Sequence, residues 1–148
     1  MKERMMFRLF SAITLIALIV IVAACGSNAV DLSGTWSGSS TGSDSRGDEY
    51  TETLVWEITQ TGNSIDGTET LTGDGYTGSA IISGTLDGNT LTFLVSGEYD
   101  TPYDGCTYSL SGEAEVMESS IIGSHESTSA CTDGSENSAS GSITLNKE

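Results

Sequence analysis

Short runs in which apolar and polar side chains alternate every second residue are the feature that most constrains the fold. In residues 107–116, Tyr108, Leu110, Ala114 and Val116 share one parity, and serine, threonine and glutamate occupy the other. A period of two is typical of a strand with one buried face and one wet face. After residue 30 we find no sustained helical periodicity of apolar residues. The sequence therefore predicts an antiparallel, all-β domain.

Turn sequences divide these runs into eight expected strands. Thr61-Gly62-Asn63-Ser64 and Asp87-Gly88-Asn89-Thr90 are hairpin turns, because glycine and asparagine tolerate a positive φ. A third turn is expected near Glu118-Ser119. The expected strands are 32–39, 50–60, 65–71, 79–86, 91–95, the two that flank Glu118-Ser119, and 136–146.

Glycines on the inward parity indicate how the sheet bends. Counting outward from each expected turn places Gly67 opposite Ile58, Gly84 opposite Phe93, and Gly112 opposite His125. A glycine within a strand often marks a bend at a barrel corner. The inward glycines are Gly34, Gly67, Gly84, Gly112, Gly123 and Gly141. We therefore expect an eight-stranded antiparallel up-and-down meander barrel, with a two-sheet β-sandwich as the alternative. An eight-stranded barrel is either filled by side chains or holds one small ligand.

Two cysteines support the same register. With residue 117 opposite residue 120, Cys106 falls directly opposite Cys131. Two cysteines in an exported chain usually pair. We therefore expect a Cys106–Cys131 disulfide.

The first 24 residues have the layout of an export signal. Basic residues are followed by the apolar run 9–22 and by small residues, and the run is too short to span a bilayer as a helix. Val22-Ala23-Ala24-Cys25-Gly26 resembles a lipobox, which implies cleavage before Cys25 and attachment of lipid to its thiol. This resemblance implies a bacterial lipoprotein with a signal peptide (1–24), a lipidated tether (25–30) and one barrel domain (31–148). We expect it in the cell envelope, and in the outer membrane if the organism is Gram-negative, since no aspartate follows Cys25.

The start of the expected first strand resembles two barrel families. Leu32-Ser33-Gly34-Thr35-Trp36 is similar to the Gly-x-Trp start of lipocalins and to a Gly-Thr-Trp of the avidin family. Together with the meander, the likeness could cover most of residues 31–146. It implies a calycin-type barrel with a mouth for a ligand. The late helix and further motifs of lipocalins are missing, as are the several tryptophans of avidins, so the ligand is not carried over.

Charge and composition exclude several function classes. Beyond residue 24 the chain has 20 carboxylates against Arg46 and Lys147, a net charge near −18. Such a surface repels phosphates, so we expect no nucleic-acid partner.

Catalysis has little support in the sequence. His125 is the only histidine and no nucleophile motif accompanies it, so we expect that the protein is not an enzyme and that His125 is an inward-facing residue. The Arg46-Gly47-Asp48 adhesion tripeptide is best explained by chance.

No cofactor is expected, and a metal site has little support. Zinc would need several histidine or thiolate ligands, which the sequence lacks. Calcium remains a weak alternative, because it takes oxygen ligands and acidic residues share two loops. These residues are Asp44, Asp48 and Glu49 in one loop and Asp100 and Asp104 in the other.

The expected loops opposite the tether form a candidate binding rim. In a meander, loops 39–49, 72–78, 97–105 and 132–135 share that end. All five tyrosines lie in or beside them, namely Tyr50, Tyr76, Tyr99, Tyr103 and Tyr108. Tyrosine combines an apolar body with a polar tip and is enriched at binding surfaces. We expect a non-catalytic binding or interaction barrel for a small or cationic ligand or a basic protein surface. The alternative is a structural envelope lipoprotein without a pocket, whose tyrosines only cap the core.

Overall fold

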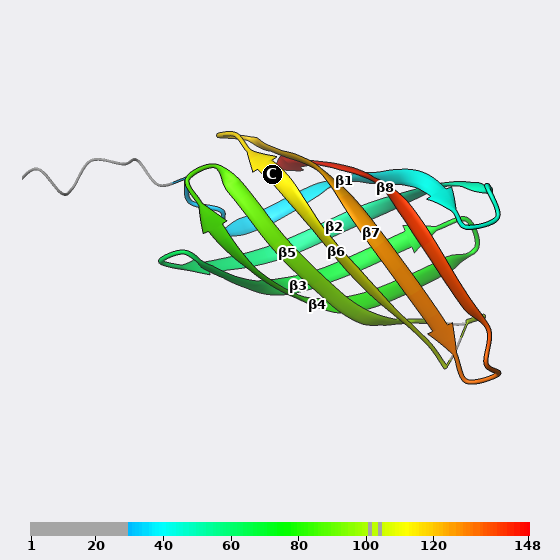
Figure 1. The fold of residues 1–148 in the computed structure, drawn as a ribbon. Coiled ribbons are helices and arrows are strands. Elements are labelled where there is room, and N and C mark those ends of the chain that lie inside the picture. The colour runs from blue at the N-terminus through cyan, green and yellow to red at the C-terminus, as the bar shows by residue number, and fades with distance from the viewer. Residues whose placement is uncertain (1–29, 101, 104) are drawn as a thin grey trace, which may run out of the picture.

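The fold is a single closed barrel of eight antiparallel strands in chain order (Figure 1). This computed structural model describes residues 30–100, 102–103 and 105–148. The expected signal peptide, Cys25 and tether residues 25–29 lie outside the described residues. The strands are β1 (Gly34–Asp44), β2 (Glu49–Thr61), β3 (Ser64–Gly73), β4 (Tyr76–Asp87), β5 (Thr90–Tyr99), β6 (Cys106–Val116), β7 (Ser120–Cys131) and β8 (Glu136–Lys147). The predicted meander barrel is confirmed, and the sandwich alternative is wrong because β8 pairs with β1.

The barrel has two unlike ends, which we call the base and the mouth. The base carries the β2–β3, β4–β5 and β6–β7 turns and the start of β1. The mouth carries the β1–β2, β3–β4, β5–β6 and β7–β8 connections. In the described part of the chain, no helix has the length and hydropathy needed to cross a membrane.

The strands reach further into the mouth than the sequence predicted. β1 continues to Asp44 instead of ending at Ser39, and the expected loop 72–78 is only a two-residue turn at Asp74-Gly75. The extension of β1 has no apolar alternation to reveal it. It is held by pairing on both sides, since Thr41 lies opposite Thr51 of β2 and Ser142 of β8. Gly75 has a φ of +81°, which explains why the β3–β4 turn is so tight.

The stagger of the barrel can be followed along one row of directly opposed residues. The row leaves β2 at Gln60 and returns to β2 at Tyr50, which is a stagger of ten residues. Its members are Gln60, Ile65, Gly84, Phe93, Gly112, His125, Gly141, Gly42 and Tyr50. With a rise of about 3.3 Å per residue and a strand spacing of about 4.8 Å, this stagger corresponds to a strand tilt of roughly 40°.

The same row shows why glycine is needed inside the barrel. The predicted pairs Gly84–Phe93 and Gly112–His125 are confirmed, as is Gly67–Ile58 in another row. A Cβ on Gly112 would collide with a backbone oxygen of β7 and lie 2.6 Å from the Phe93 ring. A large side chain therefore occupies the space that each neighbouring glycine leaves empty.

Apolar side chains fill the base half of the barrel. The Trp36 and Trp56 side chains are fully buried, and the Trp56 ring meets the Phe93 ring edge-on at 5.3 Å. Leu32 closes the base: its carbonyl accepts a 2.8 Å hydrogen bond from Trp36 Nε1, and its amide donates to Gln60 Oε1. Apolar residues on the inward parity of the other strands are buried too, namely Leu54, Ile58, Ile65, Leu71, Ile82, Leu86, Leu91, Val95, Leu110, Ala114, Val116, Ile121, Ile143 and Leu145.

Candidate functional site

A cavity of about 620 Å³ opens at the mouth, directly above the apolar filling. The side chains of all five predicted rim tyrosines line it: Tyr50, Tyr76, Tyr99, Tyr103 and Tyr108. Glu52, Leu71, Leu110 and His125 contribute from the strands, and the β1–β2 and β7–β8 connections add polar residues. A cavity of this volume is within the usual range for small-molecule sites.

Four of the tyrosines form one cluster of touching rings. Tyr76 meets Tyr99 and Tyr103 at centroid distances of 5.7 and 5.8 Å, in both cases edge to face. Tyr99 also contacts Tyr108 at 4.7 Å. Aromatic pairs at such distances add about 0.5–1.5 kcal/mol beyond burial of their area. Because the rings come from β4, β5, β6 and the β5–β6 connection, their mutual contacts hold this part of the mouth in one arrangement.

Glu52 of β2 places a buried carboxyl group beside this cluster. Its side chain is 9% exposed, and Tyr76 Oη donates a 2.5 Å hydrogen bond to its Oε1. Burial raises the pKa of Glu52, and the hydrogen bond from Tyr76 partly offsets that rise. Sequence analysis missed Glu52, although it shares the inward parity of Leu54 and Trp56. The alternation of inward and outward residues along β2 could therefore have identified Glu52 as an inward residue.

Glu69 of β3 is a second buried acid, only 1% exposed. Trp56 Nε1 donates to its Oε2 at 2.7 Å, and Tyr108 Oη donates to its Oε1 at 3.0 Å. Burial raises the pKa of Glu69 above its ordinary value, and the two hydrogen bonds only partly offset that rise. Sequence analysis missed Glu69 as well, although it shares the inward parity of Ile65 and Leu71, and its partners lie 13 and 39 residues away in the chain.

His125 of β7 lines the cavity and contacts side chains of β1 and β2. It is buried, as predicted, and its Nε2 lies 2.8 Å from Ser40 Oγ and 3.4 Å from Tyr50 Oη. Its Nδ1 has no hydrogen-bond partner among the described residues. Burial lowers the pKa of His125, which favours the neutral ring. Ser40 is fully buried, so its hydroxyl lies away from the cavity.

Neither basic residue of the described barrel forms an ion pair with the two buried acids, although Arg46 lines the same cavity as Glu52. Arg46 lies in the β1–β2 connection, where its Nη2 is 2.8 Å from Asp44 Oδ2 and its Nε is 3.7 Å from Asp48 Oδ2. A hydrogen bond from Arg46 lowers the pKa of Asp44 to about 2. Lys147 lies at the base, with its Nζ 5.4 Å from the centroid of the Trp36 ring. The Arg46-Gly47-Asp48 tripeptide is thus folded onto itself by an ion pair between its ends.

Calcium coordination finds no support in the described geometry. Within residues 30–100, 102–103 and 105–148, no group of three or more histidine, cysteine, aspartate or glutamate side chains is placed to hold a metal ion. Asp44 and Asp48 share Arg46 instead. Asp104, of the other proposed calcium loop, lies outside the described residues.

The predicted disulfide closes one side of the mouth. Cys106 and Cys131 face each other at the mouth ends of β6 and β7 and are joined by a disulfide. Both cysteines line the cavity. The bond therefore holds the tyrosine-bearing start of β6 against the end of β7.

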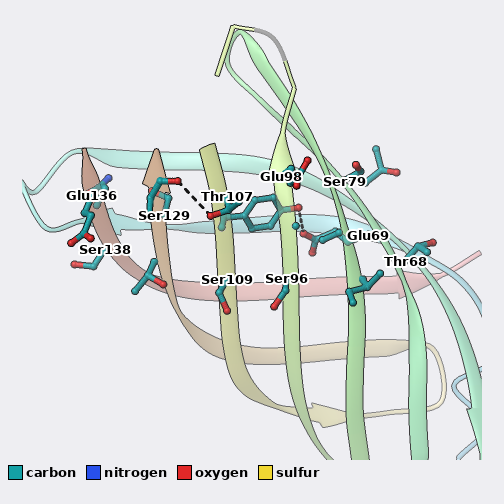
Figure 2. A pocket seen from close by; sticks show the side chains of 18 of the residues that line it. Thr68, Glu69, Ser79, Ser96, Glu98, Thr107, Ser109, Ser129, Glu136 and Ser138 are labelled. Carbon is teal, nitrogen blue, oxygen red and sulfur yellow. Dashed lines mark hydrogen bonds between the residues drawn. The ribbon is translucent and has the colours of Figure 1, made fainter. Parts of the chain in front are cut away.

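A second, shallower depression of about 1170 Å³ runs across the outside of β3 to β8 (Figure 2). Its hydroxyl side chains lie in a row over neighbouring strands, as Figure 2 shows for Ser96, Ser109 and Ser138. These side chains are exposed or half-buried, so water can satisfy them. The outer depression also reaches Glu69 and Tyr108, but the mouth cavity differs because it gathers all five tyrosines together with Glu52. We therefore place the candidate site at the mouth.

At the level of architecture, the closed eight-stranded antiparallel barrel is compatible with the calycin-type fold that the first-strand resemblance implies. Comparison with known proteins found no matching family model, curated protein or solved structure.

Proposed function

We propose that this protein is a lipid-anchored bacterial envelope lipoprotein whose barrel binds a small ligand at its mouth without catalysing a reaction. The observation that carries the proposal is the cavity of about 620 Å³, walled by five tyrosines and placed above a packed core. Concave cavities of this size that combine aromatic side chains with placed polar groups are a usual form of small-molecule sites. The alternative, a structural envelope lipoprotein without a ligand pocket, is less well supported, because side chains do not fill the mouth end of the barrel.

The direction of the mouth supports the anchoring half of the proposal. The chain enters the barrel at the base, where β1 begins, so the cavity faces the opposite way. Between Cys25 and Val30 there are five residue steps, which span at most about 18 Å when fully extended. A lipid on Cys25 would therefore hold the base close to the membrane and present the mouth outward. Absence of aspartate after Cys25 favours the outer membrane in a Gram-negative cell.

Binding at the mouth is tested with the full lipidated protein in detergent. We expect compounds from a chemically diverse library to raise its thermal unfolding midpoint, because a ligand that binds only the folded state stabilises it. Tyr103 is 50% exposed, so Tyr103→Ala should fold normally while losing about tenfold in affinity for those compounds. Ser96→Ala in the outer depression is the matched control and should bind as wild type does.

Two results would contradict mouth binding. One is a library that yields no stabilising compound for the folded, disulfide-bonded protein. The other is a set of stabilising compounds whose affinity drops with Ser96→Ala and not with Tyr103→Ala, which would move the site to the outer depression. Binding of a basic protein without any small ligand would support surface recognition instead.

A further inference from the structure

The two buried acids differ in what they offer to a ligand. Both carboxylate oxygens of Glu69 accept a hydrogen bond, one from Trp56 and one from Tyr108, and the residue is almost fully buried. Glu52 accepts one hydrogen bond, from Tyr76, on Oε1 only. Its Oε2 has no donor in the described part of the chain, and the residue lines the mouth cavity. Of the two acids, Glu52 is therefore the one that presents charge to a ligand.

Among the described residues, no lysine or arginine forms an ion pair with that carboxylate. Arg46 also lines the mouth cavity, but Asp44 and Asp48 engage it, and Lys147 lies at the opposite end over Trp36. They are the only lysine or arginine residues after Arg8. Removing a carboxylate from water is costly unless it gains a partner of opposite charge. A cationic ligand would supply that partner, and the surrounding net charge near −18 would attract it to the mouth.

The walls of the cavity narrow the type of cation. Tyrosine ring faces attract a positive charge within about 6 Å through their quadrupole. A primary ammonium has three N–H donors and needs an acceptor for each. Beside Glu52, the cavity wall is formed by the rings of Tyr76, Tyr99 and Tyr103, of which Tyr76 packs edge to face against the other two. Ring faces suit an ammonium group whose hydrogens are replaced by methyl or alkyl groups.

We infer that the mouth binds a small organic cation with an alkylated ammonium group, held by the Glu52 carboxylate and the rings of Tyr76, Tyr99 and Tyr103. This inference rests on the proposed binding function and specifies its ligand class. Glu52 is the counter-charge, and Glu69 is a positioning residue that orients Tyr108 and Trp56 from below.

The test compares a cation with its uncharged isostere on the full lipidated protein. Choline and tetramethylammonium are the charged probes, and 3,3-dimethylbutan-1-ol has the shape of choline without the charge. Affinities are measured by calorimetry at a pH of about 8, well above the ordinary range of a carboxyl pKa. We expect the charged probes to bind and the neutral alcohol to bind at least about tenfold more weakly.

Two variants assign the effect to one carboxylate. Glu52→Gln keeps an acceptor for Tyr76 and should lose at least about tenfold in choline affinity. Glu57→Gln makes the same change of charge on the exposed face of the same strand, and should bind as wild type does. Both variants are first checked for the wild-type unfolding midpoint. If Glu52→Gln unfolds, Tyr103→Ala replaces it as the test variant.

The outcomes separate this inference from the proposed function. Equal affinity for choline and the neutral alcohol, or equal choline affinity in wild type and Glu52→Gln, overturns the cation inference but leaves a ligand site at the mouth. No response to any of the three probes also overturns it, and the library screen then decides independently whether the mouth binds other compounds. If Glu57→Gln lowers the affinity for choline as much as Glu52→Gln does, the attraction is due to net charge and the assigned site is wrong.

Discussion

At the scale of the residue, the most demanding position is Glu69. A carboxyl group lies inside a barrel of apolar side chains and is tolerated because Trp56 and Tyr108 each donate a hydrogen bond to it. The same bonds satisfy the indole N–H and the phenol O–H, which would otherwise be buried without a partner. Burial raises the pKa of Tyr108, and the neighbouring Glu69 raises it further. The three side chains therefore depend on one another for their polar groups.

We predict that Glu69→Ala lowers the free energy of unfolding by about 3 kcal/mol, because it leaves two buried donors without an acceptor. Glu69→Gln should cost less, since its amide oxygen still accepts one bond. Urea unfolding of both variants measures the difference. Equal stability of Glu69→Ala and wild type would mean that water or rearranged side chains replace the carboxylate.

The raised pKa of Glu69 also predicts a dependence on pH. The folded protein holds this proton more tightly than the unfolded chain, so the group favours folding most at a pH below its ordinary pKa of 4.5. That contribution is lost as the pH rises through the folded-state pKa. The free energy of unfolding of wild type, relative to that of Glu69→Gln, should therefore fall as the pH rises above about 4.5. A difference independent of pH would contradict this assignment.

At the scale of the element, the mouth ends of the strands rely on pairing rather than on burial. The outer halves of β1 and β8 consist mainly of serine, threonine and glycine, so they bury little apolar surface. Gly42 and Gly141 lie opposite each other there, and a Cβ on either would lie 2.7 Å from Tyr50 Oη. Close backbone approach is what lets Tyr50 reach His125. On β6 and β7 the disulfide provides the corresponding restraint.

We predict that the double change Cys106→Ser and Cys131→Ser lowers the free energy of unfolding by about 3.5 kcal/mol. The bond closes a loop of 25 residues, and its loss gives that entropy back to the unfolded chain. Denaturant unfolding under matched conditions measures the effect, and intact mass with and without reductant confirms the bond in wild type. An unchanged midpoint would show that strand pairing alone holds the β6–β7 end of the mouth.

At the scale of the whole molecule, the two ends of the barrel have different chemistry. The base is closed by Leu32, Trp36 and the tight turns, whereas the mouth gathers the tyrosines and Glu52. Closure of the sheet removes every free strand edge, which discourages association through strand pairing. The strongly acidic surface adds repulsion between copies. Both properties suit the proposed anchored barrel with an outward-facing mouth.

We predict that anchoring depends on Cys25. Expressed with its own signal in a lipidating bacterium, the protein should enter the detergent phase and the membrane fraction, because two or more acyl chains give stable attachment. Cys25→Ala should move it to the aqueous phase and remove the mass of the lipid. If that change alters neither the mass nor the fractionation, the lipoprotein interpretation is wrong.

Much of the barrel follows from the sequence alone, because its information is local. Alternation within each run decides which residues point inward, and glycine or asparagine at the turns sets the register of each hairpin. For that reason the eight strands, the pairs Gly84–Phe93 and Gly112–His125, and the Cys106–Cys131 bond could all be predicted. Alternation also contained Glu52 and Glu69 as inward positions, although the abundance of acids disguised them as surface residues.

Only the tertiary structure decided how these positions meet. Closure of β8 onto β1 joins residues about a hundred positions apart, and no turn specifies its stagger of ten residues. That stagger sets the tilt, and the tilt brings Tyr76 to Glu52, Tyr108 to Glu69, and Ser40 to His125. Local sequence determines the direction in which a side chain points, but the geometry of the closed barrel determines which side chains it faces across the interior.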